Sequence, residues 1–254
     1  MKKTILISAI LSLVCALPMG VKAQQMESDL DHAGLRGDVQ MMRETTRGTH
    51  GQVIGYPISN YYNAVGNLRR VVYCDTMGTE LQEVRYKYDS LGVLNRTARF
   101  HISNNELIQE NTYTRDRRRR IVTLEMLAIQ DSLNDNIVYK FNKDGYVDDV
   151  STYDSKGTLL SRDFYKYDQN NRCIEKVYTE GVDENYRRTE QFRYDSDGNI
   201  IECRTLYITT ERQRLLYVYD FDTYDNWVKR YVYNITGKTA ELLQVVSREI
   251  IYFE

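Results

Sequence analysis

The sequence predicts an all-β protein, an antiparallel up-and-down meander of hairpin repeats that forms a twisted or curled single sheet or an open barrel. Three observations predict this fold. A turn motif recurs at intervals close to multiples of thirteen residues, the segments between turns alternate and favour strand-forming residues, and only 2 of the 254 residues are proline. A fixed period of this kind is typical of repeat architectures.

The turn motif consists of an aromatic residue, Asp or Asn, two variable positions, and Gly or Asn. A three-residue hairpin loop needs positive φ at its last residue, which Gly adopts without steric cost and Asn tolerates. The preceding Asp or Asn can accept hydrogen bonds from the N–H groups of the turn. We therefore expect a hairpin at each occurrence, at residues 62–66, 88–92, 141–145, 153–157, 167–171, 194–198 and 233–237.

Between the turns the residues alternate with period two, as in 200–207 and 227–233. If a turn takes up about four residues of each thirteen-residue period, the strands are about nine residues long, which corresponds to about 30 Å. From Tyr62 to Glu254 there is room for about fourteen to sixteen such strands. We expect loops that lack the final glycine of the motif at 100–105 and 178–185, and a short helix at 124–135.

The N-terminus is predicted to be an export signal, residues 1–23, with two lysines, an apolar stretch to Leu17 and a small-residue cleavage site ending at Ala23. The mature chain then has 254 − 23 = 231 residues. Cys15 follows a poor lipobox, so lipoprotein anchoring is not expected. No later stretch has the roughly 18 apolar residues of a membrane helix. We expect a periplasmic, extracellular or cell-surface protein with no membrane span after signal removal.

The mature chain divides into a polar segment at 24–33, expected to be disordered, and a single β domain at 34–254. Within that domain, residues 35–46 are expected to form the first strand and the glycine-rich residues 47–56 a loop. No linker interrupts the repeats.

Charge and cysteine usage exclude some functions. A net charge of −2 gives no general attraction to nucleic acid, and the basic run Arg117–Arg120 lies where the thirteen-residue period predicts a hairpin tip.

Three cysteines follow the signal, Cys74, Cys173 and Cys203. An odd, widely spaced set allows at most one bridge, and whether one forms stays open.

No catalytic, cofactor-binding or metal-binding residue is predicted. The histidines His32, His50 and His101 have no partner at dyad or ligand spacing. Two acidic stretches, 195–199 and 220–225, are similar to calcium loops, but the turn motif already explains their acidic residues. The 22 tyrosines and the single tryptophan, Trp227, could supply aromatic side chains for a binding surface. The sequence identifies no particular ligand-binding residue.

Strands of nine residues would also cross an outer membrane, so a porin-like barrel is an alternative. The segment Thr158–Tyr167 places Arg162 and Lys166 on one face and Asp163 on the other, and several other strands also carry charge on both faces. Buried lipid-facing Arg or Lys costs about 2–4 kcal/mol at mid-membrane. The charge pattern therefore favours a sheet in water.

The turn motifs resemble the YD repeats of the RHS family, most closely those of small exported proteins of Bacteroidetes-type bacteria. Three segments of this chain are similar to terminal sequences of proteins in that group, namely residues 34–39, 224–230 and 248–252. The resemblance covers roughly residues 34–254 and implies a coiled β-sheet. In large RHS proteins such repeats form a shell around a toxin and separate domains do the chemistry, but this chain has no added toxin-like domain and is too short to enclose one.

By analogy with that group, the resemblance implies carbohydrate or cell-envelope binding. The leading hypothesis is therefore a non-enzymatic scaffold or binding protein of the cell envelope, with a glycan, a peptide or an envelope protein as partner. A polysaccharide-acting enzyme that uses paired carboxylates and an outer-membrane β-barrel are the alternatives.

Overall fold

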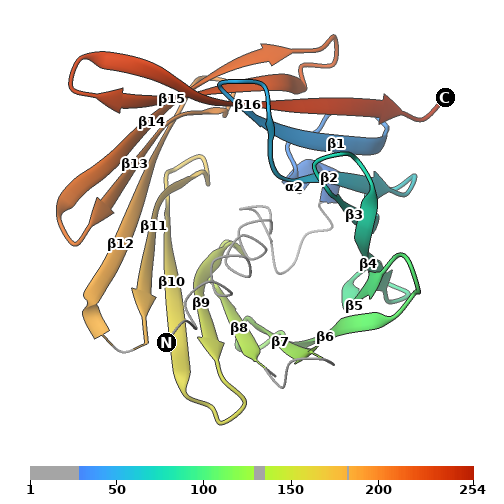
Figure 1. Ribbon diagram of the computed structural model, residues 1–254. Helices are drawn as coiled ribbons and strands as arrows, with labels where there is room; N and C mark the ends of the chain where they lie inside the picture. Colours follow the sequence, from blue (N-terminus) through green and yellow to red (C-terminus); the bar gives the residue numbers. More distant parts are fainter. Residues whose placement is uncertain (1–28, 129–134, 182) are drawn as a thin grey trace, which may run out of the picture.

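A computed structural model describes residues 29–128, 135–181 and 183–254, which form a closed barrel of antiparallel strands (Figure 1). Each strand pairs with its neighbours in the sequence, and the last strand pairs with the first. The predicted signal segment, 1–23, lies outside the described residues. The elements are α2 (Asp29–His32), β1 (Val39–Gly48), β2 (Val53–Tyr62), β3 (Leu68–Cys74), β4 (Glu80–Tyr88), β5 (Leu94–His101), β6 (Leu107–Asp116), β7 (Ile121–Ala128), β8 (Asn136–Phe141), β9 (Val147–Tyr153), β10 (Leu159–Tyr167), β11 (Cys173–Glu180), β12 (Asp183–Tyr194), β13 (Ile200–Tyr207), β14 (Thr210–Phe221), β15 (Trp227–Thr236) and β16 (Thr239–Tyr252).

The predicted all-β antiparallel meander is confirmed, but the prediction of a single sheet or an open barrel is wrong. The barrel is closed by β1 and β16, with Met42 opposite Ile250 and Thr45 opposite Ser247. Most strand pairings contain a register shift of the β-bulge type, and bulges bend a strand and increase its twist. Accumulated over the ring, this curvature brings the first and last strands together and removes both sheet edges.

The predicted turn chemistry is confirmed in detail by the loop between β4 and β5. The Asp89 N–H donates to the Val93 carbonyl (2.9 Å), and the Asp89 carboxylate accepts from the N–H groups of Leu91 (2.8 Å) and Val93 (2.9 Å). Gly92 has φ 74°, and Asn171 takes the same position in its own loop with φ 61°. Each such loop is an Asx turn that ends in a left-handed residue.

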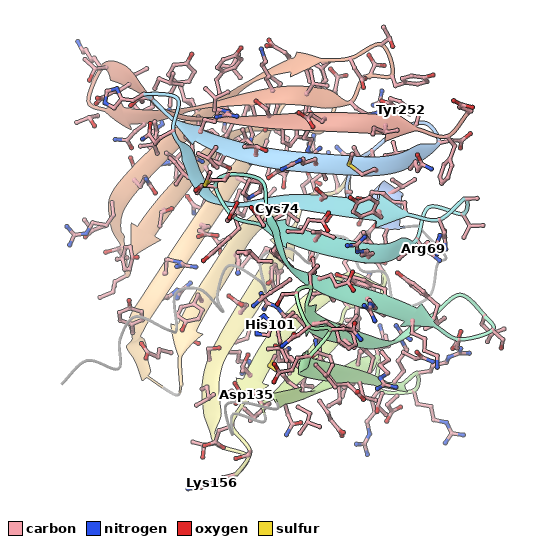
Figure 2. The ribbon with its side chains drawn as sticks, turned by 45° about the vertical axis from the view of Figure 1, so that its right-hand side comes forward. Arg69, Cys74, His101, Asp135, Lys156 and Tyr252 are labelled. Carbon is pink, nitrogen blue, oxygen red and sulfur yellow. The ribbon has the colours of Figure 1, made fainter. Side chains whose placement is uncertain are left out.

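These turns show that the structural repeat is a hairpin, which spans two of the thirteen-residue sequence periods. Seven Asx turns lie at one end of the barrel, starting at Asn63, Asp89, Asp116, Asn142, Asp168, Asp195 and Asp222. Successive starts differ by 26 or 27 residues, for example 89 − 63 = 26 and 222 − 195 = 27. We call this the Asx-turn end. In Figure 2 it carries Arg69 and Tyr252, whereas Cys74 marks the opposite end of β3.

Four local predictions about elements are corrected. The first strand is β1, which starts at Val39 and runs to Gly48, and β2 starts at Val53, so both strands occupy much of the predicted loop 47–56. The predicted helix at 124–135 is wrong at its start, because 124–128 complete β7, paired to β6 and β8; residues 129–134 lie outside the described part. Within the polar segment 24–33, Asp29–His32 form a helical turn. No helix among the described residues is long and apolar enough to cross a membrane.

The apolar core forms two clusters. One is built on β7–β9 from Val122, Leu124, Ile137, Tyr139, Phe141 and Val150. The other surrounds α2, where Leu30 packs with Leu35, Val39, Met42 and Tyr62. The second cluster explains why α2 is ordered, because burial of Leu30 ties a segment of otherwise polar sequence to the barrel.

The Asx turns should make the barrel sensitive to acid. Backbone N–H donors hold the pKa of Asp89, Asp154 and Asp168 below the usual value, most strongly those of Val93, Thr158 and Arg172 respectively. A lowered folded-state pKa contributes stability above the unfolded pKa of about 3.9, and this contribution is lost as pH falls through the folded pKa.

Changing Asp89, Asp154 and Asp168 together to Asn should therefore flatten the pH dependence of stability below about pH 4. Asn63 and Asn142 show that an amide oxygen accepts the same pair of backbone bonds. Urea unfolding of the parent and the triple variant at pH 5.5 and pH 3 tests this. Equal losses of stability in the two proteins would contradict it.

Candidate functional site

The two faces of the sheet can be told apart by following paired residues around the ring. Helix α2 lies inside the ring (Figure 1), and its Leu30 contacts Met42. Met42 therefore points inward. Residues in register with it share that face, running through Asn60, Val71 and Val84 in one direction and to Ile250 in the other. The alternate residues point outward.

The outer face carries a belt of ion pairs on β3–β6 and β9–β14. Glu83 lies between Arg70 and Arg85 and is 6% exposed, and Glu202 lies between Arg193 (3.3 Å) and Arg214 (2.7 Å) and is 2% exposed. Further outer pairs are Arg96–Glu110, Asp149–Arg162, Lys166–Glu175 and Arg204–Glu211. Pairs that join neighbouring strands, such as Arg70–Glu83 and Arg214–Glu202, also favour one strand register.

The inner face is rich in tyrosine, and one set of tyrosines follows the hairpin repeat. The tyrosine next to each of four Asx turns donates its hydroxyl hydrogen to a backbone carbonyl at the start of the preceding strand. The pairs are Tyr88 to Leu68 (2.8 Å), Tyr167 to Val147 (2.6 Å), Tyr194 to Cys173 (2.6 Å) and Tyr219 to Ile200 (2.7 Å). Tyr88 has a second partner, the Asp29 carboxylate of α2 (2.6 Å). These four tyrosines thus hold their hairpins together at the open ends.

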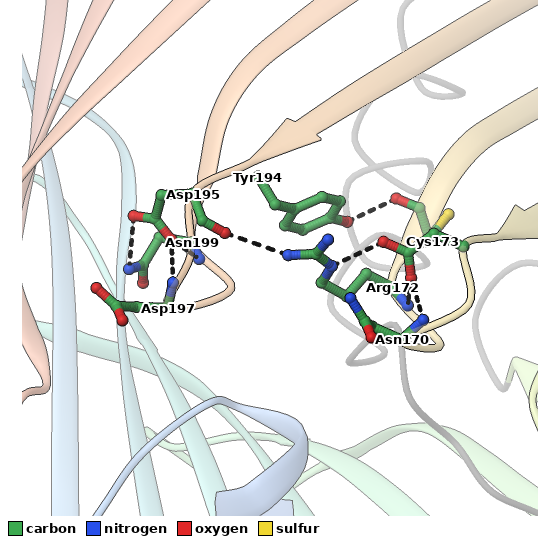
Figure 3. Close-up of polar contacts among 8 residues, drawn as sticks. Asn170, Arg172, Cys173, Tyr194, Asp195, Asp197 and Asn199 are labelled. Carbon is green, nitrogen blue, oxygen red and sulfur yellow. Dashed lines mark hydrogen bonds and ion pairs between the residues drawn. The ribbon is translucent and has the colours of Figure 1, made fainter.

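Neighbouring turns are also linked through Arg172 (Figure 3). Its Nε donates to Asp168 in its own turn (2.8 Å), its Nη1 donates to the Asp195 carbonyl in the next turn (3.2 Å), and its guanidinium lies over the Tyr194 ring at 5.0 Å. The Asp195 carboxylate accepts from the backbone N–H of Asp197 and Asn199 and from the Asn199 amide. The calcium-like stretch 195–199 therefore serves turn formation.

On β14–β16 and β1, the inner face carries a cationic aromatic cluster. We call Trp227, Arg230, Arg248 and Glu44 the tryptophan cluster. The Arg248 guanidinium lies 3.4 Å from the centre of the Trp227 ring and that of Arg230 lies 4.9 Å from it. Arg248 also pairs with Glu44 (3.2 Å). Tyr219 packs beside the indole with ring centres 5.9 Å apart.

A second charged cluster lies on the inner face of β10–β12. Lys176 pairs with Asp163 at 3.3 Å, with side chains only 10% and 11% exposed. On β12, Arg188 pairs with Glu190 at 3.5 Å. Burial raises the pKa of Asp163, and Lys176 lowers it in part. Two tyrosine rings lie under these cations, Tyr165 under Lys176 and Tyr178 under Arg188.

The inner wall therefore has two unlike halves. Around β7–β9 it is apolar and buried, whereas from β10 to β16 aromatic rings and paired charges alternate. Rings in this second half retain some exposed surface, including those of Tyr165, Tyr178, Phe192, Tyr217 and Trp227. A wall of half-buried rings with polar tips can stack on a ligand and also hydrogen-bond to it.

The barrel seam brings together the three end motifs noted in the sequence. We call the contact of Arg36 and Gly37 with Asn226 and Tyr252 the seam. Asn226 is fully buried; its side chain accepts from the Arg36 N–H (2.7 Å) and donates to the Arg36 carbonyl (2.8 Å) and the Tyr252 hydroxyl (2.8 Å). Gly37 has φ 79°, and a Cβ there would lie 3.2 Å from the Tyr224 ring. The three end motifs therefore contribute to closing the barrel between β1 and β16.

The other residues considered in the sequence are scattered. His50 lies exposed in the β1–β2 turn and His101 is half-buried at the end of β5; the His32 side chain lies outside the described part. Residues 117–120 form the β6–β7 tip, as predicted, with Arg120 at φ 54°. Cys74, Cys173 and Cys203 are buried and unbridged. No group of three or more His, Cys, Asp or Glu residues that could hold a metal is found among the described residues.

Sequence reasoning singled out Trp227 and the tyrosines but missed the charged members of both inner clusters. In the sequence, several of these charged residues lie two or three places from an aromatic residue, as Asp163 does from Tyr165 and Arg230 from Trp227. Inward and outward positions could not be distinguished before the register was known.

Comparison with known proteins supports the fold. No protein-family model matches the sequence, and no curated protein matches it. The crystal structure of a porin-like protein from Bacteroides uniformis is similar, with a TM-score of 0.58 at 10% identity, over 84% of this chain and 98% of that one. A porin-like protein from Bacteroides vulgatus gives 0.48 at 14% identity, over 85% and 98%.

The crystal structure of TcdB2-TccC3-Cdc42 matches with a TM-score of 0.31 at 15% identity, over 77% of this chain but 12% of that one. The similarity to the Bacteroides uniformis structure, at 10% identity, shows the fold alone, a closed β-barrel. The likeness to YD repeats rests on the sequence motifs and stays a resemblance.

Proposed function

We propose that this protein is an exported barrel of the cell envelope, surrounded by water, that binds a glycan along the β10–β16 half of its inner wall. The observation that carries the proposal is the difference between the faces. The outer face carries ion pairs on β3–β6 and β9–β14, whereas the inner face from β10 to β16 combines half-buried aromatic rings with paired charges that are themselves buried, as at Lys176 and Asp163. Sugar rings stack on aromatic faces while their hydroxyls bind charged groups, so a glycan matches this wall.

An outer-membrane barrel is the second candidate, because the fold is similar to that of porin-like proteins. The outer belt weighs against it. Lipid-facing Arg costs about 2–4 kcal/mol at the bilayer midplane, and the outward Arg85, Arg162 and Arg204 all lie within strands. A membrane barrel needs an apolar outer band, and its charges belong in the lumen.

Purification of residues 24–254 without detergent separates these two candidates. We expect a monodisperse protein with a β-type circular dichroism spectrum. Aggregation that only detergent relieves would favour the membrane barrel.

Glycan binding can be measured on the same material, because the chain has one tryptophan and it lies on the proposed wall. Titration with neutral and acidic oligosaccharides should change Trp227 fluorescence, and calorimetry should give matching affinities. The inner carboxylates Asp163 and Glu190 each pair with a cation. We therefore expect binding without release of shorter products, and product release that Asp163→Asn abolishes would favour the enzyme.

A further inference from the structure

The tryptophan cluster holds more positive charge than its own carboxylate neutralises. Arg230 and Arg248 both approach Trp227, and Glu44 is the acid that pairs with Arg248. Among the described residues, Arg248 Nη1 and Arg230 Nε are buried nitrogen atoms without a hydrogen-bond partner. Such donors are costly to leave unsatisfied, more so on a charged group.

Geometry makes these donors suitable for an anion. Arg248 is 11% exposed and is held in place from two sides, by the indole at 3.4 Å and by Glu44 at 3.2 Å. A guanidinium fixed in this way loses little conformational freedom when it binds a planar carboxylate. Its pKa is lowered, by burial first, which an added negative charge nearby would oppose.

We propose that Trp227, Arg230 and Arg248 form a carboxylate-binding subsite, and that the ligand is an acidic glycan containing uronic acid residues. The indole and the neighbouring Tyr219 supply aromatic surface for a sugar ring, and the two guanidinium groups supply donors for its carboxylate. This inference rests on the proposed glycan binding and specifies the class of glycan.

The test compares oligogalacturonate with a neutral maltooligosaccharide of equal length, by calorimetry and Trp227 fluorescence. The acidic ligand should bind at least about tenfold more tightly, which corresponds to about 1.4 kcal/mol. Its affinity should fall as salt rises, because the contact is charged. Arg230→Gln and Arg248→Gln should each remove most of this preference.

Arg204→Gln is the matched control, since it makes the same charge change on the outer face, where Arg204 pairs with Glu211. It should leave the preference unchanged. If Arg248→Gln fails to fold, Arg230→Gln alone decides, because Arg230 forms no ion pair with any acid in the described part of the chain.

Three outcomes are distinct. Equal binding of both glycans would overturn this inference and leave the proposed function standing. Binding of neither glycan would overturn both. Preferential binding of polyglutamate, included as a third probe, would assign the subsite to an acidic peptide and overturn the glycan assignment.

Discussion

Replacing Lys176 with methionine should lower the free energy of unfolding of the barrel by about 3–5 kcal/mol at pH 7, the usual effect of removing one partner of a buried ion pair. Lys176 and Asp163 are 3.3 Å apart and each about nine-tenths buried. Without the ammonium group, the Asp163 carboxylate stays in a poorly solvated position. Urea unfolding followed by circular dichroism measures the loss.

The pH dependence of this loss has a definite sign. Burial already raises the pKa of Asp163, and removal of Lys176 takes away a group that lowers it. A raised folded-state pKa gives stability that is present below the unfolded pKa and is lost as pH rises through the folded pKa. The Lys176→Met defect should therefore be largest near neutral pH and should shrink as the solution is acidified and Asp163 takes up a proton.

Lys166→Met is the control, because Lys166 also pairs with an acid, Glu175, but is 68% exposed on the outer face. Exposed pairs contribute about 0–1 kcal/mol. The double variant Asp163→Leu with Lys176→Met should recover much of the stability, since an apolar pair can replace a buried ion pair. Equal stability of the two single variants would show that the inner pair is well solvated.

Replacing Asn226 with alanine should open the barrel at its seam and lower the free energy of unfolding by about 2–4 kcal/mol. The substitution removes three hydrogen bonds, two to the Arg36 backbone and one to Tyr252, at a position with no exposed surface. Groups left unsatisfied in a buried position each cost about 1–3 kcal/mol.

Asn199→Ala provides the matched comparison. Asn199 occupies the same place in the β12–β13 turn that Asn226 occupies in the β14–β15 turn, but its side chain donates to Asp195 of its own turn. Hydrogen exchange should show faster amide exchange in β1 and β16 for Asn226→Ala, with β9 and β10 less affected. Uniform acceleration of amide exchange in all strands, or equal effects of the two variants, would show that the pairing of β1 with β16 does not depend on Asn226.

Local chemistry explains what could be predicted from the sequence. Turn residues such as Asp89 and Gly92 act within five residues, so each hairpin could be predicted without knowledge of the rest. From β3 onward the structure has fourteen strands, within the predicted range.

Closure could not be predicted, because it depends on contacts between the two ends of the chain. Asn226 and Arg36 are 190 residues apart, and no local pattern shows that they meet. Helix α2 was missed for a related reason. Three of its four residues are polar, and Asp29 is held by distant partners, the Leu68 N–H and the Tyr88 hydroxyl. The inner clusters were missed because the inward direction is set by the closed ring.

Pairing of β16 with β1 in antiparallel fashion has a consequence for relatives of different length. In an up-and-down ring, the first and last strands run in opposite directions only if the number of strands is even. Antiparallel closure is therefore kept only when the ring grows or shrinks by two strands at a time, so rings closed in this way should differ in length by whole hairpins of 26 or 27 residues. An insertion of half that length would bring the first and last strands together in parallel, and the antiparallel pairing of β1 with β16 would be lost.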